Sequence, residues 1–297
     1  MDSCRERLDR VPGILKRFRQ SVLAAATSGK LTEDWREETA TPFEWKKAEL
    51  LELLQSKPRN GYSPKGVDFE TDVKSLTLTA TTSGRFLPSY FKYVDELIPD
   101  YSHLWLEPDD ILIQRANTLE YVGVSVLYDG PSKGFIYPDL MMKCRANEKV
   151  LPRFLNLILQ AEPVRRHFRN NATGTAGNMP KINQQTVISA PVQWPSIPEQ
   201  REIVRRADLL FGLADSIESR FGNGRNMLER LTPALLAKAF RGELVPQDPN
   251  DEPASKLLER IVVTRSSQKK KSKSGKSSGR TKSNVNAVRS VARASRP

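Results

Sequence analysis

Residues 15–31 read LKRFRQSVLAAATSGKL, and residues 228–244 read LERLTPALLAKAFRGEL. The two stretches are identical at seven of their seventeen positions, and each has a glycine, Gly29 or Gly242, as its third residue from the end. Glycine in this place is typical of a residue that closes a helix in the left-handed conformation. The chain therefore carries an internal repeat, which predicts two helices that end in the same way.

Apolar residues recur every seven positions around both copies, which is the spacing of a coiled coil. A shift of 213 positions places Leu15 on Leu228 and Val22 on Leu235, so the copies share their register as well as their letters. This pattern is typical of helices that pack against one another. The candidate helix-interface residues, which share the spacing, are Leu8, Leu15, Val22, Leu210, Ile217, Leu228, Leu231 and Leu235.

The repeat also divides the chain. We expect an amphipathic helix over 1–30, with a kink at Pro12-Gly13 because proline disturbs a helix interior. We expect a second, longer helix over 196–245, which starts near Pro198 because proline is favoured in a first turn. The glycines of Gly222-Asn223-Gly224 predict a bend or break in this second helix.

Residues 31–195 lie between the two helices, and we expect them to form one globular α/β domain. Short runs of β-branched and apolar residues predict its strands, and two segments that open near a proline predict its helices. The expected strands are Val73–Thr79, Asp110–Arg115, Val122–Tyr128, Leu140–Arg145 and Val187–Val192, and the expected helices are Leu151–Gln160 and Val164–Asn170. The predicted fold class is therefore α+β, with one α/β domain flanked by long helices that form coiled coils.

The positive charge of the chain is concentrated at its C-terminal end. Of the 297 residues, 47 are Lys or Arg and 35 are Asp or Glu, which gives a net charge of +12. Residues 265–297 hold eleven of the basic residues and no acidic one, so the rest of the chain has 36 basic against 35 acidic residues. This composition predicts a disordered tail that either holds DNA without sequence preference or only keeps the chain soluble. The preceding stretch, 246–264, predicts a turn-rich segment and a short helix.

Motifs for catalysis and for cofactor binding are absent from the sequence. It contains no GxxxxGKS/T phosphate loop and no GxGxxG after a strand, and His103 and His167 lack the spacing of a metal pair. Pro99-Asp100 and Pro138-Asp139 resemble nuclease carboxylates, but neither is followed by Glu-x-Lys. We therefore expect no catalytic residue, no metal and no cofactor. The two cysteines form no disulfide framework, and no signal peptide or long apolar run is present, so we expect a cytoplasmic protein without a membrane partner.

The loops of the central domain carry side chains suited to DNA. Arg115 and Asn117 follow an expected strand, and arginine and asparagine are shaped for bidentate contacts to guanine and adenine edges in the major groove. Glycine-containing loops also bring backbone N–H groups close to a phosphate. The candidate DNA-binding residues, which all lie in such loops, are Arg85, Tyr90, Lys92, Arg115, Asn117, Lys133, Asn178 and Lys181. For each residue alone, the alternative is an ordinary polar surface loop.

Five long stretches resemble the DNA-specificity subunit of type I restriction–modification systems. WPSIPEQREIVRRADLLFGLADSIE (194–218) is similar to the start of that family's helical spacer, and LERLTPALLAKAFRGELVPQDPNDEPAS (228–255) is similar to its end. PDDILIQRANTLEYVGVSVLYDG (108–130) and ATGTAGNMPKINQQTVISAPV (172–192) resemble the signature stretches of its target-recognition domain. LKRFRQSVLAAATSGKLTEDW (15–35) resembles the end of the other spacer copy.

The resemblance covers roughly residues 5–260 and implies a division of labour. Members of this family normally hold two target-recognition domains, separated by two long antiparallel helices, and each domain reads one half of a split DNA site. They carry no active site, because partner modification subunits methylate adenine and a separate ATP-dependent restriction subunit translocates and cleaves DNA. The resemblance therefore implies double-stranded DNA, modification subunits and a restriction subunit as partners.

This chain carries one recognition domain where the family normally has two, so it resembles the C-terminal half of a specificity subunit. A native half-subunit, a silent cassette, a truncation and a cut piece all remain open. We expect residues 42–195 to recognise DNA, and self-association through the helices to restore a two-fold arrangement. The alternative is an interaction remnant that binds other subunits without reading DNA. A nuclease or methyltransferase fragment is a third, weaker interpretation.

Overall fold

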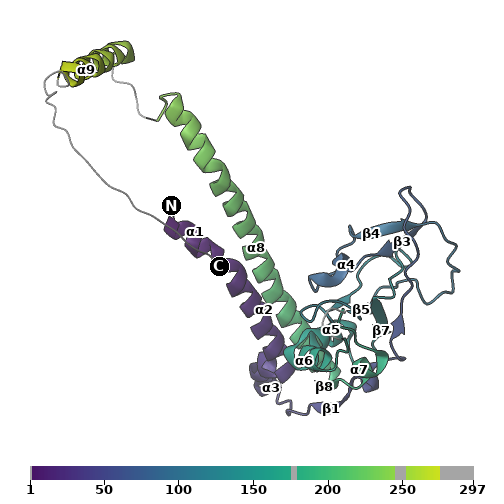
Figure 1. The fold of residues 1–297 in the computed structure, drawn as a ribbon. Coiled ribbons are helices and arrows are strands. Elements are labelled where there is room, and N and C mark those ends of the chain that lie inside the picture. Colours follow the sequence, from purple (N-terminus) through teal and green to yellow (C-terminus); the bar gives the residue numbers. More distant parts are fainter. Residues whose placement is uncertain (1, 175–178, 245–251, 275–297) are drawn as a thin grey trace, which may run out of the picture. The chain divides into compact units, whose positions relative to one another are not determined.

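The computed structural model describes residues 2–174, 179–244 and 252–274 (Figure 1). The chain divides into two compact units, Met1–Asn226 and Met227–Pro297. The first unit contains an α/β domain together with helices α1 and α2 and the first part of α8. The second unit contains the remainder of α8 and helix α9.

Helices α1 (Asp2–Asp9) and α2 (Val11–Ser28) form the N-terminal part of the first unit. Pro12 lies in the first turn of α2, where its missing N–H group is not needed. The proline therefore starts a new helix after Arg10, and the expected kink within a single helix is wrong. Gly29 follows α2 with φ +81°, as the repeat predicts, and a Cβ atom there would lie 2.5 Å from the ring of Phe43.

Helix α8 (Ile197–Phe240) is continuous over 44 residues. The predicted break at Gly222-Asn223-Gly224 is wrong, because these residues lie inside the helix. A glycine in a helix interior costs only about 1 kcal/mol relative to alanine, and helix formation is cooperative, so long flanking segments carry the helix through such a site. Gly242 follows the end of α8 with φ +71°, which repeats the geometry of Gly29.

The domain is built on a four-stranded antiparallel sheet with the strand order β2-β7-β5-β6. Two antiparallel pairs, β1 with β8 and β3 with β4, complete the strands. The strands are β1 (Lys46–Glu49), β2 (Arg59–Asn60), β3 (Val73–Leu76), β4 (Phe91–Val94), β5 (Asp110–Gln114), β6 (Ser125–Leu127), β7 (Met141–Arg145) and β8 (Pro191–Trp194). The α-helices of the domain are α3 (Glu33–Glu38), α4 (Thr79–Thr82), α5 (Pro152–Gln160), α6 (Glu162–Asn170) and α7 (Gln184–Ile188), with 3-10 turns at Lys30–Thr32 and Leu50–Leu53.

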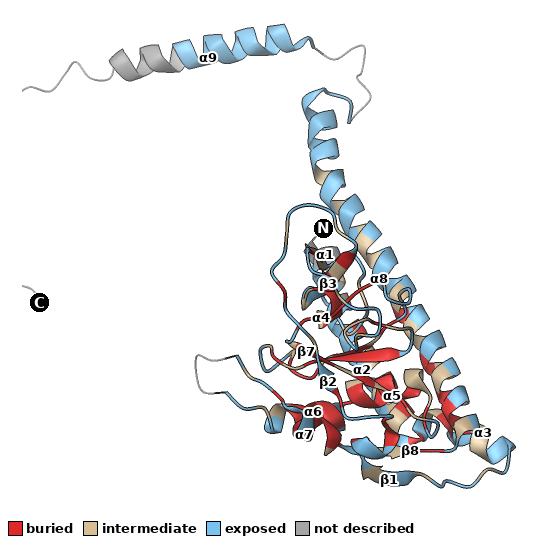
Figure 2. Ribbon diagram, turned by 90° about the vertical axis from the view of Figure 1, so that its right-hand side faces the viewer, coloured by how far each residue is buried: buried red, intermediate tan, exposed pale blue. Residues whose placement is uncertain are grey.

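Strand β5 is buried on both faces, as expected of a central strand. Ile111 and Ile113 face one core cluster, whereas Leu112 faces a second cluster on the other side of the sheet. The first cluster also contains Val22 of α2 and Ile203 of α8. Figure 2 shows buried residues in the strands, in α5 and α6, and on one side of the first part of α8. The domain and the helices of the first unit therefore share one hydrophobic core.

Most predicted elements of the domain are confirmed, and one is wrong. The expected strand Val187–Val192 is divided into helix α7 and strand β8. Asn183 caps α7, because its side chain accepts a hydrogen bond from the N–H of Thr186 at 2.8 Å, and this cap favours a helical turn. The mixed α+β fold class with long helices is confirmed.

The second unit differs from the prediction at its C-terminal end. Helix α9 (Ala254–Ser274) is 21 residues long, whereas the sequence predicts a short helix before 265. It extends ten residues into the segment that the composition predicts to be disordered, and 275–297 lies outside the described residues. In the described part of the chain, no helix has the length and apolar character that a membrane crossing requires.

Candidate nucleic-acid interface

Arg115 lies immediately after β5. Its N–H donates to the carbonyl of Leu140 at 2.8 Å, and its own carbonyl accepts from the N–H of Ile182 at 2.9 Å. Its backbone is therefore fixed on two sides, whereas among the described residues its guanidinium makes one long hydrogen bond, 3.4 Å from Nη1 to the carbonyl of Asp139. An arginine that is anchored at its backbone and keeps most of its N–H donors unengaged is suited to a bidentate contact with guanine.

Asn117 has a different role from the one that its residue type predicts. Its Nδ2 donates to Oε1 of Gln114 at 2.7 Å, and its Oδ1 accepts from the N–H of Thr118 at 2.8 Å. Gln114 is fully buried and donates in turn to the hydroxyl of Thr81 at 2.9 Å. A bidentate contact to adenine needs both ends of the amide. In this structure Asn117 holds its loop, and a contact of Asn117 with DNA stays a prediction.

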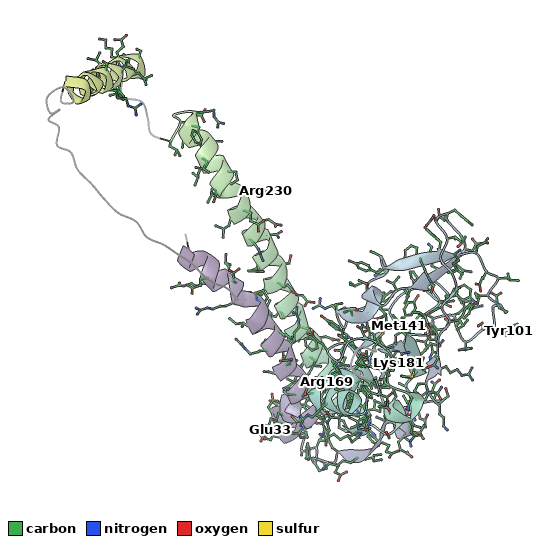
Figure 3. All side chains as sticks on the ribbon, in the orientation of Figure 1. Glu33, Tyr101, Met141, Arg169, Lys181 and Arg230 are labelled. Atoms are coloured by element: carbon green, nitrogen blue, oxygen red, sulfur yellow. The ribbon has the colours of Figure 1, made fainter. Side chains whose placement is uncertain are left out.

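Lys181 stands beside the end of β5 and is labelled in Figure 3. It forms a β-bridge with Ala116, and it exchanges two backbone hydrogen bonds of 2.8 Å with Thr173. Its exposed side chain is therefore on the segment that lies next to Arg115. The candidate Asn178 lies outside the described residues.

The loop 59–66 lies at the end of the sheet where Arg115 follows β5. The N–H of Gly61 donates to the carbonyl of Met141 at 3.1 Å, and the N–H of Tyr62 donates to the carbonyl of Tyr137 at 2.9 Å. A Cβ atom on Gly61 would lie 2.1 Å from that Tyr137 oxygen, so the close approach of the two backbones requires glycine. The glycine thus allows the loop to lie directly against the backbone of β7.

Two side chains from other elements hold the rest of this loop. The hydroxyl of Ser63 donates to Oδ1 of Asp139 in a very short hydrogen bond and accepts from the Asp139 N–H at 3.1 Å. Lys92 of β4 donates from Nζ to the carbonyl of Pro64 at 2.5 Å. The loop thereby joins Lys92 to Arg115, two residues that are far apart in the sequence.

We define the loop 59–66, Lys92, Arg115, Asp139 and Lys181 as the reading surface. Its loop exposes side chains that are not among the candidates from the sequence, namely Arg59, Asn60, Tyr62, Ser63 and Lys65. The signal for them was present, because the stretch KPRNGYSPKG at 57–66 has three basic residues and a tyrosine among its turn residues. Basic and polar side chains of these types make both phosphate contacts and base contacts in protein–DNA complexes.

Arg85 is not part of the reading surface. It forms an ion pair with Asp215 of α8, and the same Asp215 oxygen accepts from Nη2 of Arg19 of α2 at 2.8 Å. Burial raises the pKa of Asp215, but the bonds from both arginines outweigh it and hold this pKa below its ordinary value. Arg85 therefore connects the domain to the two helices, and its contact with DNA stays a prediction.

Two further candidates lie away from Arg115. Lys133 has φ +53° and pairs with Asp100 at 3.7 Å, in the part of the domain near the β3–β4 pair. Tyr90 is 46% exposed and lies two residues before Lys92. It precedes β4 and follows the turn that ends at Ser89.

Arg165 of α6 donates hydrogen bonds to the turn that follows Asn117. Its Nη1 donates to the carbonyl of Val122 at 2.5 Å and its Nη2 to the carbonyl of Glu120 at 2.8 Å. Burial and then repulsion from Arg169 lower the pKa of Arg165 to about 10, so the side chain stays charged at neutral pH. This buried arginine fixes the backbone that leads away from Arg115.

The candidate helix-interface residues of the first unit are buried to different degrees. Leu15 and Val22 of α2 are 5% and 4% exposed, and Leu210 of α8 packs against the same core. Leu8 is half-buried, whereas Ile217 is 42% exposed. The seam predicted from the heptads is therefore covered mainly where α2 and the first part of α8 meet the domain.

In the second unit two heptad rows continue, one through Leu231 and the other through Leu228 and Leu235, and both are less covered. Leu228 is half-buried, whereas Leu231 and Leu235 are 43% and 36% exposed. Met227 and Phe240 add exposed apolar surface to this part of α8. The second copy of the repeat thus carries its apolar row without a complete partner among the described residues.

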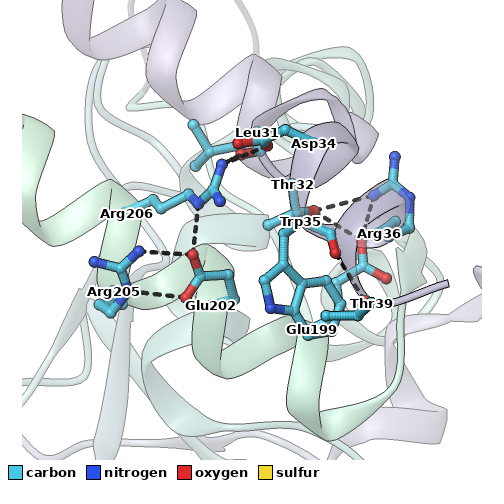
Figure 4. A network of polar contacts seen from close by, with 10 residues as sticks. All are labelled: Leu31, Thr32, Asp34, Trp35, Arg36, Thr39, Glu199, Glu202, Arg205 and Arg206. Atoms are coloured by element: carbon cyan, nitrogen blue, oxygen red, sulfur yellow. Dashed lines mark hydrogen bonds and ion pairs between the residues drawn. The ribbon is translucent and has the colours of Figure 1, made fainter. Parts of the chain in front are cut away.

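A buried ion pair joins α3, which follows α2 after a short turn, to the start of α8 (Figure 4). Oε1 of Glu199 accepts from Nη1 of Arg36 at 2.5 Å and from the hydroxyl of Thr32 at 2.8 Å. The side chains of Glu199 and Arg36 are only 2% and 11% exposed. Arg206 adds a second link, because its Nη1 donates to Asp34 at 2.5 Å. The first copy of the repeat therefore docks on the start of α8 within one chain.

Glu202 belongs to the same network in Figure 4. The hydrogen bond from Arg205, helped by Arg206 and opposed by burial, lowers the pKa of Glu202 to about 2. Because this pKa is below its ordinary value of 4.5, the stabilisation is complete above about pH 4.5 and is lost as the pH falls toward 2. The network is therefore intact at neutral pH.

The described residues include no group of three or more His, Cys, Asp or Glu side chains able to hold a metal ion. Cys144 is buried, and burial raises the pKa of its thiol to about 12. A thiol in this state is a poor nucleophile, because the reactive form is the thiolate. The chemistry that this surface offers is hydrogen bonding and positive charge.

The first unit is therefore an α/β domain that shares its hydrophobic core with a pair of helices. The chain is a homologue of the specificity subunits of type I restriction–modification systems. It is 32% identical over 293 residues to the type I restriction enzyme EcoKI specificity subunit of Escherichia coli (strain K12). The aligned region covers 95% of this chain and 62% of that relative. It is also 32% identical over 276 residues to the StySPI specificity subunit of Salmonella potsdam, with 89% and 59% covered.

Solved structures agree with this fold. A chain of a type I R-M system, studied for complex assembly and conformational transition, matches with a TM-score of 0.53 at 18% identity over 81% of this chain and 59% of that chain. The type I system S subunit from M. genitalium matches with a TM-score of 0.50 at 14% identity over 77% of this chain and 56% of that chain. No protein-family model matches the chain. The chain therefore spans about 60% of the specificity subunits that it resembles.

Proposed function

We propose that this chain is the sequence-reading part of a type I specificity subunit and recognises one half of a bipartite DNA target. The observation that carries the proposal is the reading surface, in which Arg115 stands on a rigid strand end beside a basic loop. Such a surface provides both the base contact that specifies a sequence and the phosphate contacts that position a protein on DNA. The homology to specificity subunits supports the same function.

The direct test is a selection from a library of random DNA duplexes with the purified full chain. We expect one short, contiguous motif to be enriched, and we expect its affinity to exceed that of random DNA at physiological salt. Binding that shows no motif and only a steep dependence on salt would contradict the proposal, because phosphate contacts alone produce that behaviour.

Under this proposal, partner subunits carry out the methylation and cleavage of DNA. Modification subunits would methylate adenine with S-adenosylmethionine, and an ATP-dependent restriction subunit would translocate and cleave the DNA. This chain would supply no catalytic group, and it would work in the cytoplasm, where the bacterial chromosome is. The helices of the first unit, which share the core of the domain, would hold the reading surface at a fixed orientation to these subunits.

Self-association is part of the proposal because of the repeat. The first copy docks in the same chain on the start of α8, whereas the second copy carries Leu231 and Leu235 partly exposed. A second chain would supply helices for this row and would restore two recognition domains related by two-fold symmetry. We expect the pair Leu228→Glu and Leu235→Glu to reduce association at least tenfold, because charges are costly in a coiled-coil seam. Analytical ultracentrifugation measures the change.

The matched control is the pair Ser219→Glu and Asn226→Glu. These exposed residues are also seven positions apart on α8 and add the same charge, but they lie outside both heptad rows. They should leave the association constant unchanged. The preference for a half-site should survive in both double variants, and loss of that preference in the leucine variant alone would show that the row serves the reading surface.

The interaction remnant is the second candidate function, and the exposed part of the apolar row favours it. The basic segment 265–297 allows the two candidates to be separated, because it holds eleven basic and no acidic residues. Its deletion should weaken binding to all sequences alike and should flatten the salt dependence, by about 0.9 in logarithmic slope for each phosphate that the segment neutralises. A DNA-reading chain retains its motif after this deletion, whereas a remnant retains no binding. Fluorescence anisotropy at several salt concentrations measures both.

A further inference from the structure

Asp139 places a carboxylate within a surface that is otherwise basic. It lies between the Ser63 hydroxyl, which bonds its Oδ1, and Arg115, whose Nη1 reaches its carbonyl oxygen at 3.4 Å. The residue is exposed, and among the described residues its carboxylate enters no ion pair. Arg59, Lys65, Lys92, Arg115 and Lys181 are the basic residues of the same surface. A negative group is therefore displayed where positive groups would meet DNA.

A carboxylate in this position opposes contacts with the DNA backbone, because it repels phosphates. It gains from DNA only where it meets a hydrogen-bond donor. The major groove displays such donors on base edges, and a carboxylate accepts from the exocyclic amine of cytosine. The charge of Asp139 therefore weakens binding to DNA in general and strengthens binding to a particular sequence.

The geometry pairs this acceptor with a donor. Because Arg115 bonds the backbone of Asp139, the guanidinium and the carboxylate start from neighbouring points on the surface. Arginine donates to O6 and N7 of guanine, and aspartate accepts from N4 of cytosine. The two side chains thus fit the two bases of one G·C pair, both approached from the major groove, or the bases of two adjacent pairs.

We propose that Asp139 is a specificity-determining residue that accepts a hydrogen bond from the exocyclic amine of a cytosine beside the base contacted by Arg115. This inference rests on the proposed function and adds a second base contact to it. Asp139 also orders the loop 59–66 through Ser63, so the two roles need to be separated by experiment. Their signatures differ, because removing the charge of Asp139 raises the affinity for random DNA, whereas loosening the basic loop lowers the affinity for all sequences alike.

The test compares Asp139→Asn with Ser63→Ala in the full chain. Asparagine keeps the shape and an acceptor for Ser63 but removes the charge, and alanine at 63 removes the tether but keeps the charge. We expect Asp139→Asn to bind random duplexes more tightly and to lose about tenfold of the preference for cytosine at one position of the selected motif. We expect Ser63→Ala to keep that preference, and any affinity it loses by loosening the basic loop should be the same for all sequences.

Two results would overturn the assignment while the proposed function stands. The first is that the Asp139→Asn chain still enriches a DNA motif, and that this motif is the same as the one enriched by the unmodified chain. The second is an equal loss of cytosine preference in Ser63→Ala, which would mean that Asp139 acts through the loop. If the unmodified chain enriches no motif, the proposed function fails, and this assignment fails with it. Motifs come from selection on random duplexes, and affinities come from competition titrations.

Discussion

Replacing Glu199 by alanine is expected to lower the free energy of unfolding of the first unit by about 3–5 kcal/mol, the usual penalty for breaking a buried ion pair. Oε1 of Glu199 accepts hydrogen bonds from Arg36 at 2.5 Å, from Thr32 at 2.8 Å and from Trp45 Nε1 at 3.3 Å. Alanine would leave the Arg36 guanidinium, which is 11% exposed, without its counter-charge. Urea unfolding followed by tryptophan fluorescence measures the loss, and Trp45 reports on the site itself.

Two variants serve as controls for this effect. Asp208 pairs with Arg153 on the surface, where the side chains are 45% and 40% exposed, so Asp208→Ala should cost no more than about 1 kcal/mol. Replacing both members of the buried pair, with Glu199→Gln and Arg36→Met, should recover much of the loss, because no buried charge then lacks a partner. If Glu199→Ala unfolds at the same urea concentration as the unmodified chain, the ion pair does not join the two helices in solution.

The repeat made the helices predictable because helix ends have local rules. Gly29 and Gly242 adopt φ +81° and +71°, and both values follow from glycine's preference for the left-handed conformation after a helix. The strands around Ile111 and Cys144 were predictable from short apolar runs, and their pairing places these two residues opposite each other. These signals depend on neighbours within one turn or one strand.

The errors in the fold came from places where local signals compete. The run at 187–192 is apolar and β-branched enough for a strand, but the cap from Asn183 favours a helical turn over its first part. The glycines at 222 and 224 are weak helix formers, but the cooperative helix on either side extends through them. Neither outcome follows from residue propensity alone. Each depends on which of two competing local structures has the lower free energy in the folded chain.

The candidate site was predictable only in part, because its contacts join distant residues. Ser63 and Asp139 are 76 positions apart, and Arg85 and Asp215 are 130 apart. Residue type marked Arg85 and Asn117 as DNA contacts, but the fold supplies a carboxylate to the first and an amide oxygen to the second. Whether a polar side chain is free for a ligand depends on such partners.

Arg115→Ala should remove between about 1 and 3 kcal/mol of discrimination at one base pair, which corresponds to roughly a five- to 150-fold loss of preference. The reason is geometric, because the backbone of Arg115 is bonded on both sides to Leu140 and Ile182 while most of the guanidinium is unengaged. The fork of donors is therefore held in one place, as a bidentate contact requires. Quantitative selection on random duplexes, read position by position, measures the loss.

Loss of charge alone would also weaken binding, so the decisive control is Arg115→Lys. Lysine keeps the positive charge but presents a single point of donation, so it should retain affinity for random DNA and still lose most of the discrimination. Lys65→Ala should do the reverse, with a uniform loss over all sequences and an unchanged motif. If Arg115→Lys reads the same motif as the unmodified chain, Arg115 contacts only phosphate. The base contacts of this domain would then have to come from other side chains of the reading surface.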